Sequence, residues 1–299
     1  MQAFPKIFSI GTDYIRNIFK NDVECTEKAD GSQFSWGKIY GELYIRSKGK
    51  QMFVDNPEKM FQAGVDHVCS IAHLLPENVM FHNEYLRAPK HNVLTYGRIP
   101  KNHHLLFGMM KFPEQIFVDN HDVLSEWAER LGIEVIPLLY RGNVSTPEFL
   151  RGLLERESVL GGVKIEGVVV KNYQEKFLLG GQPMPLMAGK YVSEAFKEVH
   201  REKWGKEHTG KGKWDTFKES FCTEARWAKA VQHLEERGEL LHAPQDIGRL
   251  MKEVNQDILD EEEQTIKDFL WKEFGKEVLR TAARGLPEWY KQQLLERSL

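Results

Sequence analysis

The sequence predicts an α+β fold: a domain of mainly antiparallel sheets with flanking helices, followed by a small all-α domain. Two observations predict it. Before about residue 200, short segments rich in β-branched and aromatic residues alternate with Gly, Pro and Asn. After that point, strand signals stop and apolar residues recur at helical spacing. We therefore expect one domain over residues 1–200 and a second, helical one over residues 201–299.

The elements of the first domain follow from local pattern. Helical patterns lie at about 57–75 and 121–131, and a third follows Thr146-Pro147-Glu148, an order typical of an N-cap with Pro at the first helical position. Four segments are typical of strands, at residues 34–46, 104–110, 133–140 and 164–171.

Three apolar stripes predict the helices of the second domain. They run from Phe221 to Leu234, from Ile247 to Ile258 and from Ile266 to Val278. We interpret the stripes as core-packing faces, and Asp246 as an N-cap. The lysine- and glycine-rich segment 197–218 is typical of a solvated linker, and it could also contact a phosphate backbone.

Composition bounds the class of protein. The 299 residues carry a net charge of −3, so the whole molecule does not attract nucleic acid electrostatically, although a local groove can still be basic. There is no apolar run long enough for a membrane span and no pattern of a secretory signal. Three widely spaced cysteines argue against a disulfide framework and favour a reducing cytoplasm, of a cell or of an infected host.

One short segment suggests nucleophilic chemistry. Glu27-Lys28-Ala29-Asp30-Gly31 places a lysine just before a turn and a strand. A lysine partly buried among other cations can lose its proton near neutral pH and become a nucleophile. Gly31 would allow a sharp turn and bring backbone close to a ligand. A Lys-x-Asp-Gly segment alone also occurs as an ordinary turn.

Five further segments carry charges or aromatic rings at strand-like positions. Glu166 and Lys171 open and close an apolar strand, which is unusual unless both ends lie in solvent. The other four segments centre on Arg46-Ser47-Lys48-Gly49, Glu84, Phe107 and Lys190. No segment is decisive by itself.

Taken in order, these segments resemble the motif set of the covalent nucleotidyltransferases, which are the DNA ligases, RNA ligases and mRNA capping enzymes. The resemblance covers about residues 24–197. Motif I corresponds to Lys28–Gly31, motif Ia to Arg46–Gly49, motif III to the segment around Glu84, motif IIIa to the strand with Phe107, motif IV to Glu166–Lys171, and motif V to Lys190.

The resemblance implies a role for each residue. Lys28 would attack the α-phosphate of ATP and carry AMP, and Lys190 would neutralise charge on that phosphate. Glu166 would position Mg²⁺ or Mn²⁺. The remaining residues would bind the nucleotide: Arg46 at ribose or phosphate, Glu84 at the ribose hydroxyl, Phe107 stacked on adenine, and Glu27 and Lys171 nearby.

The helical tail indicates which branch of the covalent nucleotidyltransferases the chain resembles most. DNA ligases and capping enzymes usually append a β-rich domain after motif V, whereas the tail here resembles the phage T4 RNA ligase 2 family. That family implies an ATP-dependent RNA ligase, with nicked duplex RNA or RNA ends as partner, no membrane, and a monomeric state. The sequence departs from motif V at Val192, where a second lysine is usual. Either Lys190 suffices, or Lys171 or Lys197 supplies the charge.

Two alternatives remain open from the sequence. The same scaffold could serve a DNA ligase or a mixed-substrate ligase. Val192 could also mark a ligase-like protein that binds nucleotide or RNA without sealing it. A capping guanylyltransferase is disfavoured by the tail.

Overall fold

A computed structural model describes residues 4–144, 148–192 and 213–297 of the chain. The chain forms two compact units, Met1–Asn255 and Gln256–Leu299. The domain boundary that the sequence predicts near residue 200 falls in 193–212, outside the described residues, as do Lys197 and the predicted N-cap at Thr146. Cys25, Cys69 and Cys222 are free thiols, as expected. Among the described residues, no helix combines the length and apolar character that crossing a membrane requires.

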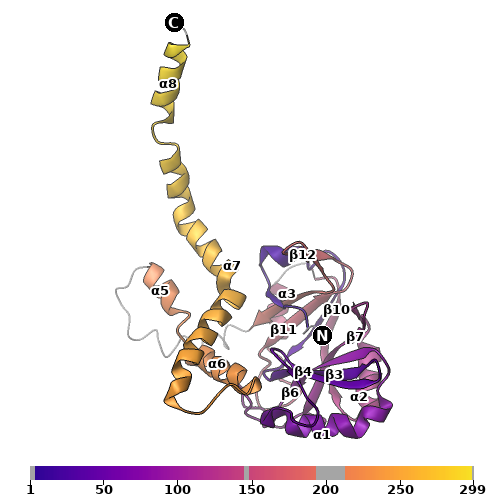
Figure 1. The fold of residues 1–299 in the computed structure, drawn as a ribbon. Coiled ribbons are helices and arrows are strands. Elements are labelled where there is room, and N and C mark those ends of the chain that lie inside the picture. The colour runs from indigo at the N-terminus through magenta and orange to yellow at the C-terminus, as the bar shows by residue number, and fades with distance from the viewer. Residues whose placement is uncertain (1–3, 145–147, 193–212, 298–299) are drawn as a thin grey trace. The chain divides into compact units, whose positions relative to one another are not determined.

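Two sheets form the centre of the first unit (Figure 1). Sheet A holds β2, which carries Glu27 and Lys28, and β11, which carries Lys171, side by side and antiparallel. All of its strand pairs are antiparallel except β1 with β14. In spatial order its strands are β1 (Phe8–Ser9), β14 (Met187–Val192), β11 (Gly167–Asn172), β2 (Val23–Lys28) and β10 (Leu138–Gly142).

Sheet B carries Arg46, Glu84 and Phe107 on three of its strands. It is antiparallel apart from the short β9, Glu134–Val135, which runs parallel to β7. Its other strands are, in spatial order, β5 (Gln51–Met52), β4 (Glu42–Ser47), β3 (Ser32–Ile39), β6 (Val79–Tyr85), β7 (His104–Lys111) and β8 (Ile116–Phe117). A separate hairpin joins β12 (Phe177–Leu179) to β13 (Gln182–Met184).

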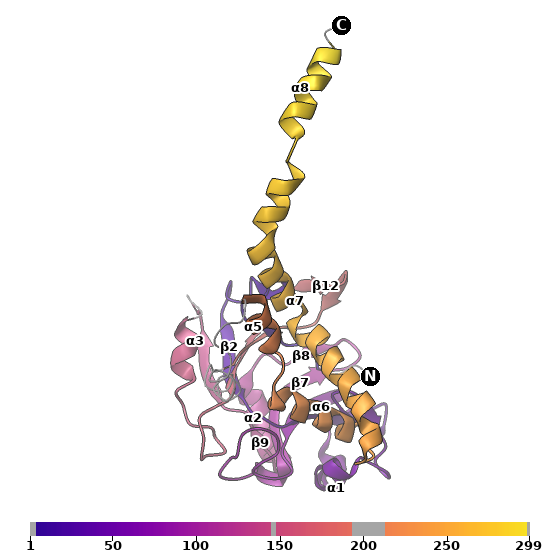
Figure 2. The same cartoon turned by 90° about the vertical axis from the view of Figure 1, so that its left-hand side faces the viewer.

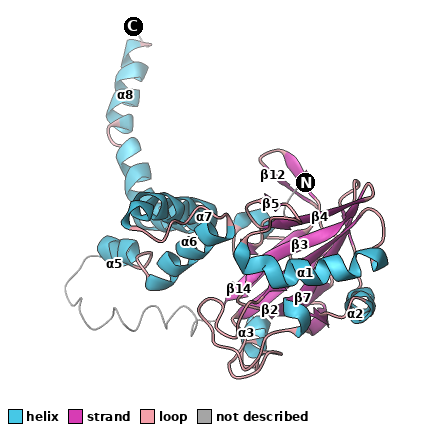
Figure 3. Ribbon diagram, turned by 60° about the horizontal axis from the view of Figure 1, so that its bottom comes forward, coloured by secondary structure: helices cyan, strands magenta, loops and turns pink. Residues whose placement is uncertain are grey.

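Helices cover the outer faces of the two sheets. The helices α1 (Gln62–Ile71) and α2 (His121–Arg130) pack on sheet B around Phe34 and Trp36, and Figure 3 shows α1 crossing its strands. The short α3 (Glu148–Leu153) packs on sheet A beside β2 (Figure 2). A third cluster, with Ala188 of sheet A and Met80 of sheet B, fills the space between the sheets. The predicted α+β class is confirmed.

The residues after 212 form helices, as the sequence predicts. They are α5 (Lys213–Glu219), α6 (Glu224–Glu236), α7 (Ile247–Ala282) and α8 (Leu286–Glu296). Short 3-10 turns lie at Asp13–Ile15, Lys59–Phe61, Ala72–Leu74, Lys101–His103 and Pro244–Asp246.

The core-packing interpretation holds in part for the first stripe and fails for the other two. In the first stripe, Leu234 of α6 is buried, with 2% of its surface exposed, whereas Trp227 is 48% exposed. In α7, which contains the second and third predicted stripes, Met251, Phe274 and Val278 are exposed. An apolar stripe indicates a preference for burial, but it does not show which other element, if any, covers that face of the helix. The expectation that Asp246 is an N-cap is wrong, because Ala243 is the N-cap of the 3-10 turn Pro244–Asp246. The Asp246 carboxylate instead accepts from the backbone amides of Leu241 and Ala243 at 3.0–3.1 Å.

Candidate functional site

Lys28 ends β2 with its side chain on the inner face of sheet A. Because side chains alternate along a strand, Val23 and Cys25 point to the outer core while Lys28 points toward sheet B. Its ammonium Nζ lies 2.5 and 2.6 Å from the two oxygens of Glu166. Glu166 immediately precedes β11, whose Gly167 is the register partner of Lys28. The motif I lysine and the motif IV glutamate are therefore in direct contact.

Gly167 makes this junction possible. A Cβ built on it would lie 2.6 Å from the carbonyl oxygen of Tyr191 and 3.0 Å from Cα of Val192, which is too close for any side chain. Only glycine therefore lets β14 approach β11 beside Glu166. Val192, the departure from motif V, is the register partner of this glycine at the end of β14.

The charges around Lys28 are the reverse of those expected from the sequence. Burial lowers the pKa of the Lys28 ammonium, but the negative charges of Glu166, Glu84 and Asp30 outweigh it and the pKa is raised. The expectation of a lysine partly buried among cations is therefore wrong. In this structure Lys28 is an ammonium ion held by carboxylates, and it must lose a proton before it can act as a nucleophile.

Glu84 reaches the same site from β6 in sheet B. Its Oε1 accepts a hydrogen bond of 2.9 Å from the backbone amide of Gly31. Burial raises the pKa of the Glu84 carboxyl to about 8, in spite of the opposing charge of Lys28. Burial also raises the pKa of Glu166, partly offset by Lys28 and by the charge of Lys190. The site thus holds more acidic groups than the single ammonium can balance.

The turn after Lys28 is fixed from several sides. Asp30 is buried, and one of its carboxylate oxygens accepts from the amides of Val93 and Leu94, both at 2.8 Å. Its own amide donates to the Tyr96 hydroxyl at 2.7 Å. Sequence reasoning missed this role of Asp30, because its partners lie more than 60 residues away in a segment with no pattern of its own.

The lysines of motifs IV and V share the face of Lys28. Lys190 lies opposite Val169 on β11, which in turn lies opposite Thr26 on β2, two residues before Lys28. Lys171 is almost fully buried and donates to the carbonyl oxygen of Phe107. Burial lowers the pKa of Lys171 to about 8. Lys190 and Lys171, the one described candidate for the missing motif V charge, therefore lie on one sheet face.

Arg46 and Phe107 come from sheet B. Arg46 is buried on β4, and its guanidinium donates to the carbonyl oxygens of Ser47 and Lys48 at 3.0 and 3.2 Å. Phe107 is partly buried, with the ring of Phe4 edge-on at 5.0 Å and Lys171 Nζ 5.9 Å from its centroid. The Phe107 ring thus lies in the apolar layer between the sheets.

Glu27 points away from Lys28. It lies on the outer face of β2, and its carboxylate accepts from Ser158 Oγ at 2.5 Å and from the amide of Val159 at 3.1 Å. Burial raises the pKa of Glu27, and those hydrogen bonds oppose the rise. The structure does not bring the Glu27 carboxylate into the Lys28–Glu166 contact, so its expected nucleotide contact stays a prediction.

Comparisons with known proteins show the family of the chain. A family model described as RNA ligase matches residues 21–192, a span that contains every motif residue discussed above. No curated protein sequence matches the chain.

Solved structures share the fold. A Naegleria gruberi RNA ligase with PPi superposes with a TM-score of 0.53 at 16% identity, over 67% of this chain and 58% of that one. A variant of that ligase with ATP and Mn gives a TM-score of 0.52 at 16% identity, over 67% and 59%. The match thus spans less than two thirds of the Naegleria protein. Since the family model covers more than half of the residues, the chain belongs to the RNA ligase family.

Proposed function

We propose that this protein is an ATP-dependent RNA ligase that joins 3′-hydroxyl and 5′-phosphate ends through a lysyl-AMP and an RNA-adenylate. The observation that carries the proposal is the contact of Lys28 Nζ with both oxygens of Glu166, with Glu84 beside it. In a member of the RNA ligase family, a lysine held in this way is the natural acceptor of AMP.

In the first step, Lys28 Nζ attacks the α-phosphate of ATP. The Lys28 ammonium first loses one proton to become the nucleophilic amine. A nitrogen–phosphorus bond then forms, the bond from that phosphorus to the pyrophosphate oxygen breaks, and a second proton leaves the nitrogen. The carboxylate of Glu166 is the acceptor nearest to Nζ. Lys190, on the same sheet face, would stabilise the charge that develops on the phosphate.

The nucleotide would lie between the two sheets. Phe107 offers a ring for adenine and Glu84 an oxygen for the ribose hydroxyl, while Arg46 supplies a forked donor to ribose or phosphate. Lys171 would add positive charge from β11. This assignment leaves Glu27 as a support of the loop at Ser158 and Val159.

The residues present suit a divalent ion. Mg²⁺ binds through one or two carboxylates together with phosphates and water, and not in a complete protein cage. Glu166 and Glu84 both act on Lys28, so two carboxyl groups are available at one site. Glu166 would hold Mg²⁺ or Mn²⁺, whose positive charge would weaken the hold of the carboxylates on the Lys28 proton.

The later steps involve RNA. AMP would pass from Lys28 to a 5′-phosphate, and a 3′-hydroxyl would then displace it. We infer that the protein acts as a monomer in the cytoplasm, and that the helical tail positions the RNA. The basic segment 197–218 stays a candidate for phosphate contacts, with most of its residues outside the described part of the chain.

Labelling of the protein tests the proposal. Full-length protein incubated with α-labelled ATP and Mg²⁺ should acquire a covalent label, and Lys28→Ala should abolish it with little change in melting temperature. Lys111→Ala, at an exposed position on β7, is the matched control and should label normally. Peptide mapping should place AMP on Lys28, and an adduct on Lys48 or Lys171 would overturn the assignment.

The same preparation distinguishes the other members of the superfamily. Nicked duplexes with either an RNA or a DNA 3′-hydroxyl strand should show preferential sealing of RNA. Equal sealing of both would indicate a mixed-substrate ligase, and competition by GTP for the label would indicate a capping-type enzyme. Absence of any label on the wild-type protein would indicate a binding protein without ligase chemistry.

A further inference from the structure

One helix of the tail packs directly on the segment that follows Lys28. Residues 213–255 belong to the same compact unit as the two sheets, and α6 buries Ala230 and Leu234, four residues apart on one face. Glu236 is also buried, with only 4% of its surface exposed. A helix that only tethered an RNA-binding tail would have no need to bury a charged side chain here.

The Glu236 carboxylate holds a glutamine amide against motif I. Nε2 of Gln232 lies 2.6 Å from Glu236 Oε1 and 2.6 Å from the hydroxyl oxygen of Ser32. It also lies 3.5 Å from the carbonyl oxygen of Gly31. The Ser32 hydroxyl is in turn 2.8 Å from the His91 ring, so the residue after the motif I turn is held from both sides.

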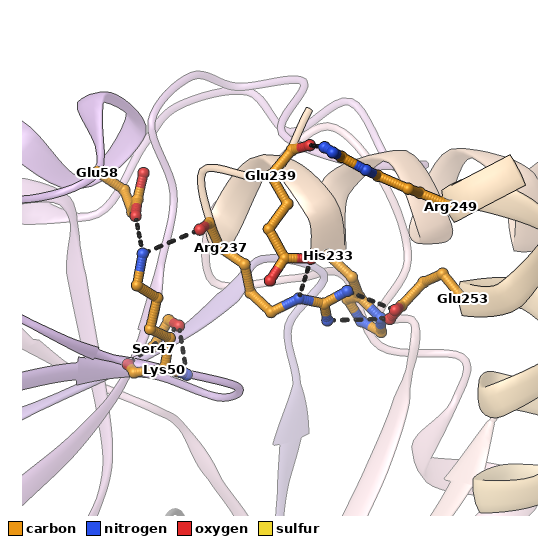
Figure 4. Close-up of polar contacts among 8 residues, drawn as sticks. All are labelled: Ser47, Lys50, Glu58, His233, Arg237, Glu239, Arg249 and Glu253. Carbon is orange, nitrogen blue, oxygen red and sulfur yellow. Dashed lines mark hydrogen bonds and ion pairs between the residues drawn. The ribbon is translucent and has the colours of Figure 1, made fainter. Parts of the chain in front are cut away.

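A second contact joins α6 to motif Ia. Lys50 Nζ, in the loop between β4 and β5, donates to the carbonyl oxygen of Arg237 at 3.0 Å and to Glu58 at 2.8 Å (Figure 4). The side chain of Arg237 packs over Gly49, at 3.4 Å from the position of an added Cβ. The helix therefore contacts the segments next to Lys28 and next to Arg46.

The end of α6 is itself anchored to the start of α7. Glu253 accepts from Arg237 through both oxygens, and one of them lies 2.8 Å from His233 Nδ1 (Figure 4). The pairing fixes the rotation of α6 about its axis, and with it the direction of Gln232 one residue earlier.

We propose that α6 is part of the adenylating machinery and that Gln232 is a positioning residue for Lys28. Gln232 restrains the Gly31–Ser32 turn, whose amide also binds Glu84, and so holds Lys28 in line between Glu166 and the α-phosphate. This inference rests on the proposed function. It extends the adenylating unit beyond residue 200, into a helix that carries none of the family motifs.

The test is the rate of protein-AMP formation by Gln232→Ala in the full chain. Loss of one restraining hydrogen bond should slow single-turnover adenylation about three- to tenfold, at an unchanged KM for ATP. The same variant should seal pre-adenylated RNA at close to the wild-type rate, because that substrate bypasses the attack by Lys28. Gln256→Ala, which removes an exposed helical glutamine of α7, is the matched control and should change neither rate.

A double-mutant cycle keeps the test independent of folding. Ser32→Ala removes the acceptor, and the double variant should be no slower than the slower single variant. A wild-type adenylation rate in Gln232→Ala would overturn the inference. So would equal losses in adenylation and in sealing of pre-adenylated RNA, accompanied by a lower melting temperature. Failure of the wild-type protein to label would be a failure of the proposed function itself and would remove the basis of the inference.

Discussion

The surroundings of Lys28 and Lys171 shift the pKa values of these two lysines in opposite directions. Lys171 has the lowered pKa, about 8, whereas the pKa of Lys28 is raised by three carboxyl groups. A search for the most easily deprotonated lysine would therefore select Lys171. Its ammonium, however, is bound to the Phe107 carbonyl oxygen, while Lys28 faces the Glu166 carboxylate, which is a suitable ligand for a divalent metal. Geometry therefore favours Lys28 as the nucleophile. Its ammonium must lose a proton, and a divalent ion bound at Glu166 would favour that loss.

The pKa of Lys171 makes a prediction about stability and pH. Since burial lowers the pKa to about 8 in the folded state, the unfolded chain binds the extra proton between about pH 8 and 10. The free energy of unfolding contributed by this residue should therefore rise with pH there, by at most about 1.4 kcal/mol per pH unit. Lys171→Met should remove this rise, which urea titrations at several pH values would measure.

Comparing Lys171→Met with the parent protein separates the contribution of Lys171 to the pH dependence of stability from that of other groups that titrate in the same pH range. Lys111→Met, at an exposed position of β7, is the control and should keep the parental pH dependence. If Lys171→Met also keeps it, Lys171 is not the buried ammonium that the structure shows.

A second prediction at this scale concerns Phe107. Phe107→Ala should weaken the use of ATP in adenylation by about 1–3 kcal/mol, whereas Phe107→Tyr should cost much less because it retains an aromatic face for adenine. Initial rates across ATP concentrations measure the loss. The Phe107 ring also packs on Phe4, so melting temperatures must accompany the rates. Equal losses in both variants would mark Phe107 as a core residue only.

At the scale of elements, the turn between β2 and β3 depends on close backbone packing. A Cβ on Gly31 would lie 2.6 Å from the Tyr85 carbonyl oxygen and 2.9 Å from Cγ of Glu84. Gly31→Ala should therefore push β6 away from Lys28, lower the free energy of unfolding by about 1–3 kcal/mol and slow adenylation. Denaturant titration and single-turnover labelling would measure the two effects.

A glycine in open space provides the control for that prediction. Gly152 in α3 has no atom within 4 Å of an added Cβ, so Gly152→Ala should leave adenylation unchanged and stabilise the helix by up to about 1 kcal/mol. Parental stability and labelling in Gly31→Ala would show that the turn tolerates a side chain and that its geometry does not matter.

The elements were predictable where a pattern is local. The strand expected at 104–110 is β7, and that expected at 164–171 is β11 with a later start. The run at 34–46 is instead a hairpin that turns at Tyr40 and Gly41, and the run at 133–140 breaks near Pro137 into β9 and β10. Composition indicates that a segment prefers a strand. The strand pairing stops where Pro137 lacks an amide donor and where Gly41 adopts a left-handed conformation.

At the scale of the whole molecule, the sequence predicted which residues lie in the site better than it predicted the directions of their side chains and the charges around them. The motif order placed Lys28, Glu84, Glu166 and Lys190 in one site because the resemblance supplied the topology. The outward direction of Glu27 follows from the alternation of adjacent side chains along β2 once Lys28 points inward. The carboxylates around Lys28 come from other strands, and their approach depends on strand pairing, which no local pattern encodes. The contact of Gln232 with Ser32 joins residues 200 positions apart, beyond any periodicity argument.

The organisation of the whole chain gives the last prediction. A protein ending near residue 205 contains all the motifs and should still form Lys28-AMP, but more slowly than the full chain because it lacks α6. A protein ending at residue 255 keeps the contacts of Gln232 and Lys50 and should label at the full rate. We expect the shorter protein to lose most sealing of nicked RNA, since positioning of the 5′-phosphate against bound AMP is worth several kcal/mol, about tenfold for each 1.4.

Charge reversal within the full chain separates RNA positioning from mere coverage of apolar surface. Charge reversal to Glu at Lys203 and Lys211, both outside the described residues, and at Lys213, the first residue of α5, should weaken RNA affinity and flatten its salt dependence, because each phosphate contact releases counterions. Adenylation should be unaffected by them. If the reversals leave RNA affinity unchanged while the shorter protein is insoluble, the tail serves the catalytic unit by packing alone. If the shorter protein folds, labels and seals like the full chain, neither α6 nor the rest of the tail takes part in the reaction.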